Sequence, residues 1–498
     1  MQSFRSEIEN PIVEKDILDL AKKIAQFKAG EIHEEKFRSL RLARGVYGQR
    51  QQGVQMIRIK LPYGKIQFHQ WKRIADISDE YSTGNLHLTT RQDIQIHFVS
   101  LDRTPELWAK LEQDDITLRE ACGNTVRNIT ASPTSGIDPK ELFDVSPHAD
   151  AAFRYFLRNP ICQEMGRKIK MSFSNTEEDT SLAYLHDVGF IPKIQNGTRG
   201  FKVVVGGGLG AQPMLAHTAY EFLAEDQVIP FIESVLRVFD RHGERNSRHK
   251  ARMKFLIQKI GFEEFMNLVN AETKALKNHS FAIADASAWE VAEPTLQADI
   301  AAPETAEYQT WIDTNTFEQK QAGFHAVYVR ILNGNISSDT SRSLIEALKG
   351  YIGDDIRITI NQGLMLKFVP TANLPYVFQV LNAHGLAAPG ANSIANITAC
   401  PGTDTCNLAI SDSTNITSKL EQVINEEFPA LIHDSAMKIK ISGCMNACGQ
   451  HSMASIGFHG SSLKAADKRV LPALQVLIGG ATLGNGEGRI ADKVIKVP

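Results

Sequence analysis

The sequence predicts a mixed α/β (α+β) protein in which one structural unit occurs twice. Five segments recur in the same order at a spacing of about 270 residues, which indicates an internal duplication. In each copy, patterns typical of strands alternate with patterns typical of helices. The copies also differ, because only the second contains closely spaced cysteines. The matching segments are 56–66 with 328–336, 86–99 with 356–369, 128–133 with 396–401, 168–175 with 438–446, and 201–207 with 474–480.

Each copy begins with an alternating strand pattern, which is followed by an amphipathic helix and a second strand. This order predicts a ferredoxin-like βαβ half in each copy. Each half continues into an α/β unit that contains the NITA(S/C)P loop, a strand with the letters KIK, and a strand that ends in glycine. The polar stretch 271–320 connects the copies. A charged surface helix is predicted near the N-terminus.

These elements predict six segments along the chain. They are a helical arm at 1–36, a ferredoxin-like half-domain at 37–115, an α/β domain at 116–290, a linker at 291–320, a second ferredoxin-like half-domain at 321–388, and a cysteine-bearing α/β domain at 389–498.

Composition excludes several classes of protein. The 54 basic and 57 acidic residues give a net charge near −3, so no nucleic-acid partner is expected. No run of eighteen apolar residues and no leader peptide is visible, so we expect no membrane association and a reducing, cytoplasmic location. In that setting Cys122 and Cys162 are free thiols.

Four cysteines in two pairs predict a metal centre: Cys400 and Cys406, then Cys444 and Cys448. Thiolate sulfur selects zinc or iron–sulfur clusters. Zinc sites usually use tighter Cys-x2-4-Cys pairs, so the five-residue gap of the first pair favours a [4Fe–4S] cluster. A disulfide pair is the alternative, although six cysteines in 498 residues without a secretory signal disfavour it.

The differences between the copies separate sulfur from positive charge. Cys400 and Cys444 of the second copy correspond to Ser132 and Ser174 of the first, whereas Arg91 corresponds to an asparagine. If the halves face each other, a cluster lies on one side of a central cavity and an anion-binding wall lies on the other.

The motifs TACPGTDTC and GCMNACG, with LTTRQDIQIH, RNITASP and RKIKMSFS, resemble the sirohaem-containing nitrite/sulfite reductase family over residues 36–498. The resemblance implies the internally duplicated fold of that family, with sirohaem and substrate bound by 116–290 and the [4Fe–4S] cluster and sirohaem bound by 389–498. It also implies that Cys448 bridges the cluster to the sirohaem iron, which couples the two electronically.

The resemblance also implies which residues bind sirohaem, whose eight carboxylates suit arginine forks. We expect Arg91 and His97 to share one face of a strand with Gln95 between them, by the period of two. The basic segment 245–255 is expected to add further carboxylate partners, although a solvated helix face is the alternative. The residues assigned to cofactor binding are Arg91, Gln95, His97, Arg248, Arg252, Lys254 and Asn446.

Four cations match the substrate-binding positions of the family: Arg58, Arg127, Lys168 and Lys170. They are expected to bind an oxyanion over the haem, stabilise charge as its bonds break, and supply protons. The KIK spacing alone carries no such information, because the second copy repeats it. Relatives that prefer sulfite have lysine at the position of Lys170 and those that prefer nitrite have asparagine, so we expect six-electron reduction of sulfite to sulfide.

Alternatives remain open at this point. They are nitrite reduction to ammonia at the same site, a related precorrin synthase, and an iron–sulfur electron-transfer subunit without its own chemistry. The segment Gly206-x-Gly208-x-x-Ala211 imitates a dinucleotide fingerprint, but a lone match is weak evidence. Electrons are therefore expected from an external donor, a ferredoxin or a flavoprotein. In some relatives the residues that match Tyr47 and Cys122 are covalently joined; a packed tyrosine and a buried thiol are the alternative.

Overall fold

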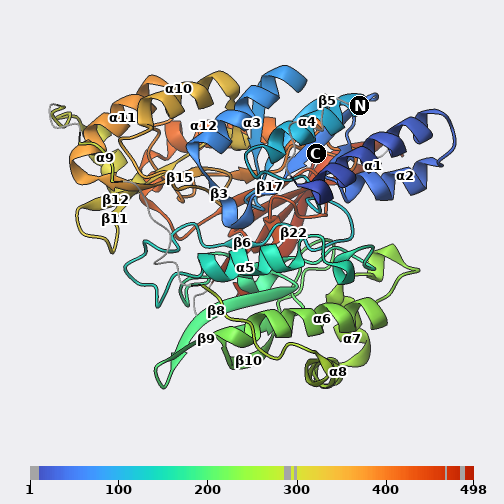
Figure 1. The fold of residues 1–498 in the computed structure, drawn as a ribbon. Helices are drawn as coiled ribbons and strands as arrows, with labels where there is room; N and C mark the ends of the chain where they lie inside the picture. Colours follow the sequence, from blue (N-terminus) through green and yellow to red (C-terminus); the bar gives the residue numbers. More distant parts are fainter. Residues whose placement is uncertain (1–9, 285–292, 297–299, 466–467, 483–487) are drawn as a thin grey trace.

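The computed structural model describes residues 10–284, 293–296, 300–465, 468–482 and 488–498. Parts of the predicted arm (1–9), the first α/β domain (285–290), the linker (291–292 and 297–299) and the last domain (466–467 and 483–487) lie outside the described residues. Within the described residues, four five-stranded sheets form two matching pairs, and one two-stranded sheet accompanies them. Figure 1 shows the helices of the half-domains in an upper layer and the first α/β domain below them.

The first half-domain contains an antiparallel sheet with the strand order β1-β2-β5-β4, covered by helices. Its strands are β1 (Val46–Gly48), β2 (Val54–Ile59), β4 (Asn85–Leu88) and β5 (Ile94–Ser100). Its helices are α3 (Phe68–Tyr81) and α4 (Thr104–Glu112), and the N-terminal helices α1 (Pro11–Lys28) and α2 (Glu34–Leu42) precede them. Helix α1 buries Val13, Ile17, Leu20 and Ile24 and contacts α4, so the predicted arm is docked onto this half.

The second half-domain repeats this arrangement, with the order β11-β12-β15-β14. Its strands are β11 (Thr316–Glu318), β12 (Phe324–Val329), β14 (Ile356–Ile358) and β15 (Leu364–Pro370). Its helices are α9 (Ala306–Asn315), α10 (Ser338–Leu348) and α11 (Leu374–Ala383).

Each half-sheet is completed by a strand from the other copy. Strand β3 (Lys65–Ile66) pairs with β14, and β13 (Asn335–Ser337) pairs with β4. Helices α3 and α10 pack against each other, and one apolar core runs through both half-domains. The two halves therefore form a single unit with approximate two-fold symmetry.

The α/β domains also match each other, with two parallel strand pairs followed by antiparallel ones. The first contains β6 (Thr130–Ala131), β7 (Met171–Phe173), β8 (Val188–Gln195), β9 (Thr198–Val205) and β10 (His217–Ala224), with α5 (Ser146–Phe156), α6 (Val228–His242), α7 (Met253–Ile260) and α8 (Phe262–Ala275). The second contains β16 (Thr398–Ala399), β17 (Ile439–Ser442), β18 (Ile456–Lys464), β19 (Val470–Ile478) and β22 (Asp492–Val497), with α12 (Ser413–Glu427). The small sheet is β20 (Ala481–Thr482) with β21 (Gly488–Arg489).

Two buried glutamines connect the halves reciprocally. The Gln92 amide donates to the carbonyls of Ala131 (2.9 Å) and Ile358 (3.0 Å), and its oxygen accepts from Ala131 N–H. Gln362 repeats the arrangement with Ala399 and with the Leu88 carbonyl. Each glutamine thus binds its own α/β domain and the sheet of the other half.

A left-handed glycine makes room beside each glutamine. Gly64 has φ +70° and Gly334 has φ +68°. A Cβ at Gly64 would lie 2.7 Å from the Ile358 carbonyl, and a Cβ at Gly334 would lie 2.5 Å from the Leu88 carbonyl. Only glycine tolerates both the conformation and the close approach.

No helix in the described ranges has the length and apolar character needed to cross a membrane.

We expect Gln92→Ala to lower the free energy of unfolding by about 2–4 kcal/mol, since it leaves buried backbone groups of both halves without partners. Urea denaturation measures the change. Gln422→Ala, at an exposed position on α12, is the control and should change it by less than about 0.5 kcal/mol. Equal effects of the two substitutions would contradict the role of Gln92 as a connection.

Candidate active site

The four cysteines lie on two neighbouring loops at one edge of a sheet. Cys400 and Cys406 follow β16, and Cys444 and Cys448 follow β17, which pairs with β16 in parallel. Since parallel strands bring their carboxyl ends to the same edge, the loops are adjacent. Burial and the neighbouring Cys448 thiol together raise the pKa of the Cys400 thiol to about 12. The Cys448 thiol also raises the pKa of the Cys406 and Cys444 thiols, so the four thiols lie near one another.

Backbone N–H groups point at three of these sulfurs. The Gly443 N–H donates to Cys400 Sγ at 3.1 Å, and the Gly402 N–H also bonds this sulfur. Backbone amides likewise reach Cys406 and Cys444, and the Asn446 side chain donates to Cys444 Sγ at 3.4 Å. Such bonds stabilise thiolates, which is the form that binds a cluster.

All six cysteines are free thiols, so the disulfide alternative is wrong. In the described part of the chain, no three His, Cys, Asp or Glu side chains converge closely enough to hold a single metal ion. Four cysteines that each bind a different iron of a cluster need no such convergence.

The first copy clamps the cysteine loops in place. The Arg50 guanidinium donates to the carbonyls of Cys406 (3.3 Å) and Ala409 (2.7 Å), and Arg50 N–H donates to the Thr405 carbonyl. The Thr90 hydroxyl donates to the Cys448 carbonyl at 2.8 Å. The sequence pattern gave no indication of these contacts, because they join residues more than 350 positions apart.

The corresponding loops of the first copy are closed by hydroxyl hydrogen bonds. Ser132 Oγ bonds Thr180 Oγ1 and accepts from Asn175 N–H, and Ser174 Oγ donates to Asp179. The strand pairing aligns Ser132 with Cys400, so this serine stands where the second copy has a possible cluster ligand. The expected match of Ser174 with Cys444 is wrong, because the same pairing aligns Ser174 with Ser442.

Two arginines of the first copy have few acidic partners. Arg58 has one nearby carboxylate, and Arg127 is held by neutral backbone carbonyls. Arg58, on β2, lies 3.6 Å from Asp93 and 19% of its side chain is exposed. Burial alone would lower the pKa of Arg58, but Asp93 and the Cys122 and Cys448 thiols outweigh burial and raise it. Arg127 donates from Nε to the Gly123 carbonyl at 2.9 Å and from Nη1 to the Ala121 carbonyl at 3.1 Å.

Lys168 and Lys170 are half-buried among other cations. Among the described residues, neither ammonium group has a hydrogen bond or a carboxylate within 4 Å. Burial, then Lys170, Arg127 and Arg252, lower the pKa of Lys168 far below its ordinary range. Burial, Arg91 and Arg252 lower the pKa of Lys170 to about 7, although the Cys448 thiol acts in the opposite direction. Such crowding is relieved by a bound anion.

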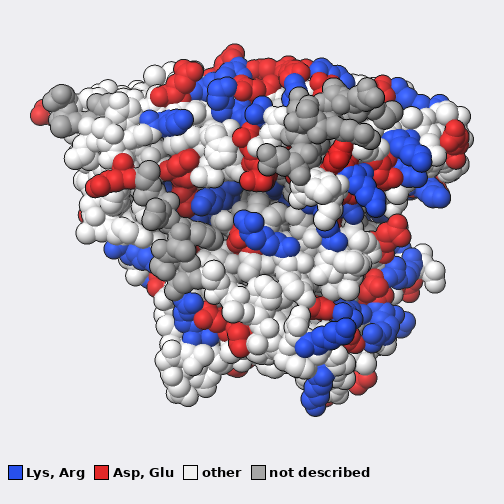
Figure 2. Space-filling view, in the orientation of Figure 1, with Lys and Arg blue, Asp and Glu red and all other residues white. Residues whose placement is uncertain are grey.

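Arg167 belongs to the same group, and sequence reasoning missed it. Burial, Arg248 and Arg252 lower its pKa to about 10, and its Nε is buried without an acceptor. The signal was present in the run Arg167, Lys168, Lys170, which places a third cation beside the two lysines. Figure 2 shows Lys and Arg atoms along the band between the upper and lower layers of the molecule.

The expectation that Arg91 lies inside a strand is wrong. Arg91 lies in the turn between β4 and β5, because Gln92 takes φ +55° and interrupts the extended backbone. Its guanidinium bonds His186 Nε2 and the carbonyls of Asn128 and Met171. Burial lowers the pKa of Arg91 to about 9, and its Nε has no acceptor.

Gln95 and His97 lie on β5, as expected. Gln95 is the register partner of Arg58, and its amide oxygen, when turned toward the guanidinium, accepts from it. Burial, His87 and Arg58 lower the pKa of His97 to about 3, so its imidazole is neutral at pH 7.

In the basic segment 245–255, some residues are exposed and others bond to the rest of the protein. Arg248 is exposed in a 3-10 turn (Arg248–Lys250) before α7. Arg252 forms a bidentate pair with buried Asp187, in which Nε donates to Oδ1 at 3.2 Å and Nη2 donates to Oδ2 at 3.0 Å. Lys254 donates to the carbonyls of Gly208, Leu209 and Gln212, and so holds the glycine-rich loop.

Tyr47 and Cys122 lie close enough to influence each other. Burial raises the pKa of Tyr47, and the Cys122 thiol is the second cause. Cys122 is 2% exposed. Their covalent link remains a prediction.

Known proteins share these features. The model of the nitrite and sulphite reductase 4Fe-4S domain matches residues 122–277 and 390–495, and that of the nitrite/sulfite reductase ferredoxin-like half domain matches 47–114 and 317–384. The chain belongs to the nitrite and sulphite reductase family. The reductase is thus an oxidoreductase with the internally duplicated fold of this family.

The curated relatives of the reductase include proteins named sulfite reductase and proteins named nitrite reductase. It is 27% identical over 467 residues to sulfite reductase [ferredoxin] 1 of Mycolicibacterium paratuberculosis, which covers 89% of this chain and 79% of the relative. It is 28% identical to the assimilatory ferredoxin-dependent nitrite reductase of Haloferax mediterranei, with 88% and 76% covered. The solved structure of Mycobacterium tuberculosis NirA superposes with a TM-score of 0.82 at 24% identity, covering 97% of this chain and 88% of that one.

The cofactors of the family are sirohaem and a [4Fe–4S] cluster, and the residues of the reductase fit both. Four free thiols with amide donors around them suit the cluster. Among the residues that the structure describes, the buried Nε of Arg167 has no acceptor and the ammonium groups of Lys168 and Lys170 have no partner, which suits a polycarboxylate and a small oxyanion.

If Cys448 is the bridging ligand that the family resemblance predicts, Cys448→Ala should lose turnover and change the visible spectrum, because it would remove a thiolate that serves both cofactors. Iron, acid-labile sulfide and absorbance of the purified protein measure the outcome. Cys162→Ala, in the apolar core of the first α/β domain, is the control and should keep both cofactors. Unchanged bands and normal turnover in Cys448→Ala would disprove the bridging assignment.

Proposed function

We propose that the reductase converts sulfite to sulfide with six electrons from an external protein donor. The observation that supports this proposal is the presence of two half-buried lysines without a partner among the described residues, with Arg127 close to Lys168 and Arg58 close to Arg127. Buried cations are costly unless an anion pairs with them. A small, doubly charged oxyanion supplies that pairing.

In the proposed reaction, each sulfur–oxygen bond of sulfite breaks and its oxygen leaves as water. The reduction therefore consumes six electrons, and two protons accompany each oxygen. When bound, sirohaem and the cluster supply the electrons one at a time to the sulfur atom of the anion.

The four cations have different roles in the proposed reaction because their side chains differ in acidity. Arg58 and Arg127 keep their charge at every physiological pH, so they bind the anion and stabilise the charge that develops. Lys170, with a pKa near 7, can give up a proton and recover it from solvent. Lys168 gains a proton when the anion binds, because the added negative charge offsets its cationic neighbours.

The external donor is proposed to be a ferredoxin. Several relatives of both activities are named as ferredoxin-dependent enzymes. The exposed Arg50 side chain binds the Cys406 loop, so it adds a positive charge at the surface beside the cysteine loops, which we propose as the place where the donor docks.

Nitrite reduction to ammonia is the second candidate, because relatives at 26–28% identity are named as nitrite reductases. A monoanion needs less positive charge than a dianion. Lys170 favours sulfite for this reason.

We expect Lys170→Asn to shift the ratio of kcat/KM toward nitrite by about tenfold, equivalent to about 1.4 kcal/mol of transition-state stabilisation. Asparagine keeps a hydrogen-bond donor and removes the charge that attracts a dianion more strongly than a monoanion. Both anions are assayed with one reduced donor for the wild type and the variant.

Lys438→Asn is the matched control. Lys438 occupies the equivalent position in the second copy, because its carbonyl accepts from Ile456 N–H as that of Lys170 accepts from Val188 N–H. The Lys438 ammonium group donates to the neutral Asn392 carbonyl. This substitution should leave the ratio within about twofold even where it lowers stability. An equal fall of both activities in Lys170→Asn would remove the support for sulfite.

A further inference from the structure

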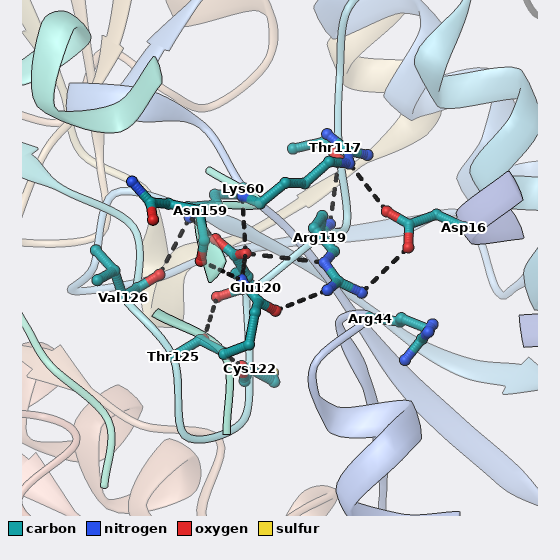
Figure 3. Close-up of polar contacts among 12 residues, drawn as sticks. Asp16, Arg44, Lys60, Thr117, Arg119, Glu120, Cys122, Thr125, Val126 and Asn159 are labelled. Atoms are coloured by element: carbon teal, nitrogen blue, oxygen red, sulfur yellow. Dashed lines mark hydrogen bonds and ion pairs between the residues drawn. The ribbon is translucent and has the colours of Figure 1, made fainter. Parts of the chain in front are cut away.

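A buried carboxylate lies directly behind the loop that leads to Arg127. Glu120 is 0% exposed. Its Oε1 accepts from the Arg158 backbone N–H at 2.9 Å and from the Gln163 side-chain amide at 2.7 Å. Lys60 Nζ lies 3.6 Å from Oε2 and Arg119 Nε lies 3.8 Å from Oε1. Figure 3 shows these contacts meeting at Glu120 from several elements.

The backbone of Glu120 is in an unfavourable conformation. Its φ is +61°, in the left-handed region that residues other than glycine, asparagine and aspartate rarely occupy. Such a conformation persists only where surrounding contacts impose it, and it often marks a functional segment. The Glu120 N–H donates to the Ala43 carbonyl at 2.7 Å, which fixes the start of the loop.

The loop that follows Glu120 turns its carbonyl groups toward Arg127. The carbonyls of Ala121 and Gly123 accept from Nη1 and Nε of Arg127. Thr125 Oγ1 donates to the carbonyls of Glu120 and Cys122 and so closes the loop on itself. In the described part of the chain, Arg127 Nη2 has no hydrogen-bond partner, so this edge of the guanidinium is the one available to an anion.

Lys60 connects the same carboxylate to the segment that carries Arg127, just before β6. Its Nζ donates to the Val126 carbonyl, the residue before Arg127, at 3.1 Å. Lys60 is 2% exposed, and it has the Glu120 carboxylate beside it as a counter-charge. The carboxylate thus fixes both ends of the segment 120–127.

The second copy contains a matching brace without the arginine. Arg330 donates to the Ala395 carbonyl and pairs with Glu421 at 3.2 Å. Here the carboxylate comes from helix α12 and no equivalent of Arg127 follows. Holding the NITA(S/C)P strand is therefore common to both halves, whereas a loop that aims an arginine exists only in the first.

We propose that Glu120 is a positioning residue for the anion site: its buried carboxylate anchors residues 120–125 so that their carbonyls hold the Arg127 guanidinium with Nη2 toward the substrate anion. This inference rests on the proposed function, in which Arg127 binds the oxyanion. Glu120 itself touches neither substrate nor cofactor.

The test compares Glu120→Gln with Glu421→Gln in the holoenzyme. Glutamine keeps the size and an acceptor for the Arg158 N–H, but it removes the counter-charge of Lys60. We expect the KM for sulfite to rise about tenfold in Glu120→Gln with kcat within about threefold. Glu421→Gln removes the equivalent charge from the other copy and should leave this KM within twofold. Thr125→Val loosens the loop without a change of charge and should raise KM about threefold, so the test survives if Glu120→Gln folds poorly.

Hydrogen exchange of peptides that span 120–127 gives a readout independent of turnover. Exchange should increase in Glu120→Gln and Thr125→Val and stay unchanged in Glu421→Gln. The double variant Glu120→Gln/Arg127→Ala should have the same KM as Arg127→Ala alone, because Glu120 acts through Arg127.

Three outcomes overturn the positioning role: an unchanged KM in Glu120→Gln despite faster exchange of the loop, equal increases of KM in Glu120→Gln and Glu421→Gln, or additive effects in the double variant. If Arg127→Ala itself leaves the KM unchanged, the proposed role of Arg127 fails instead.

Discussion

The reciprocal pairing of the two copies is the constraint on which the site depends. Strand β3 completes the sheet of the second half, strand β13 completes that of the first, and Gln92 and Gln362 tie each α/β domain to both halves. A slip of one half would leave several buried backbone groups without partners, each at a cost of about 1–3 kcal/mol. The loops after β6–β7 and those after β16–β17 are therefore held in matching places around the pseudo-two-fold axis, and each copy can specialise its own.

The specialisation is a division between sulfur and positive charge. In the second copy the loops hold thiols that accept backbone N–H bonds, and Lys438, the equivalent of Lys170, donates to the neutral Asn392 carbonyl. In the first copy serines close the loops, and Lys168 and Lys170 keep no partner among the described residues. The arrangement in the second copy is stable without a bound anion. The arrangement in the first copy stores unfavourable electrostatic energy that a bound anion relieves. Sites that break the rules of local stability in this way are usually functional.

The duplication, the half-domains and the cysteine pairs followed from the sequence, because repeats and close spacings are local patterns. The amphipathic helix predicted after the first strand of the first half-domain is present as α3 (Phe68–Tyr81). The exchange of β3 and β13 was not visible, since two or three residues carry no register signal. The sequence predicts a strand at Arg91 because apolar and polar residues alternate on both sides of it. The strand is interrupted there by a turn, in which Gln92 has a positive φ, and this backbone conformation is not visible in the sequence. Arg50, Thr90 and Glu120 act through contacts that are distant in sequence or set by backbone conformation, so no spacing rule finds them. The assigned roles of the site cations remain predictions.

The central claim is that the thiol loops and the cation wall serve one reduction of sulfite. The most direct test is the stoichiometry of electrons to sulfide in an anaerobic assay of the purified holoenzyme with a reduced one-electron donor and sulfite. The account predicts one sulfide for every six electrons consumed, with no release of partly reduced sulfur. Electron consumption with nitrite but none with sulfite, or the absence of sulfide when sulfite is the only acceptor, would contradict it.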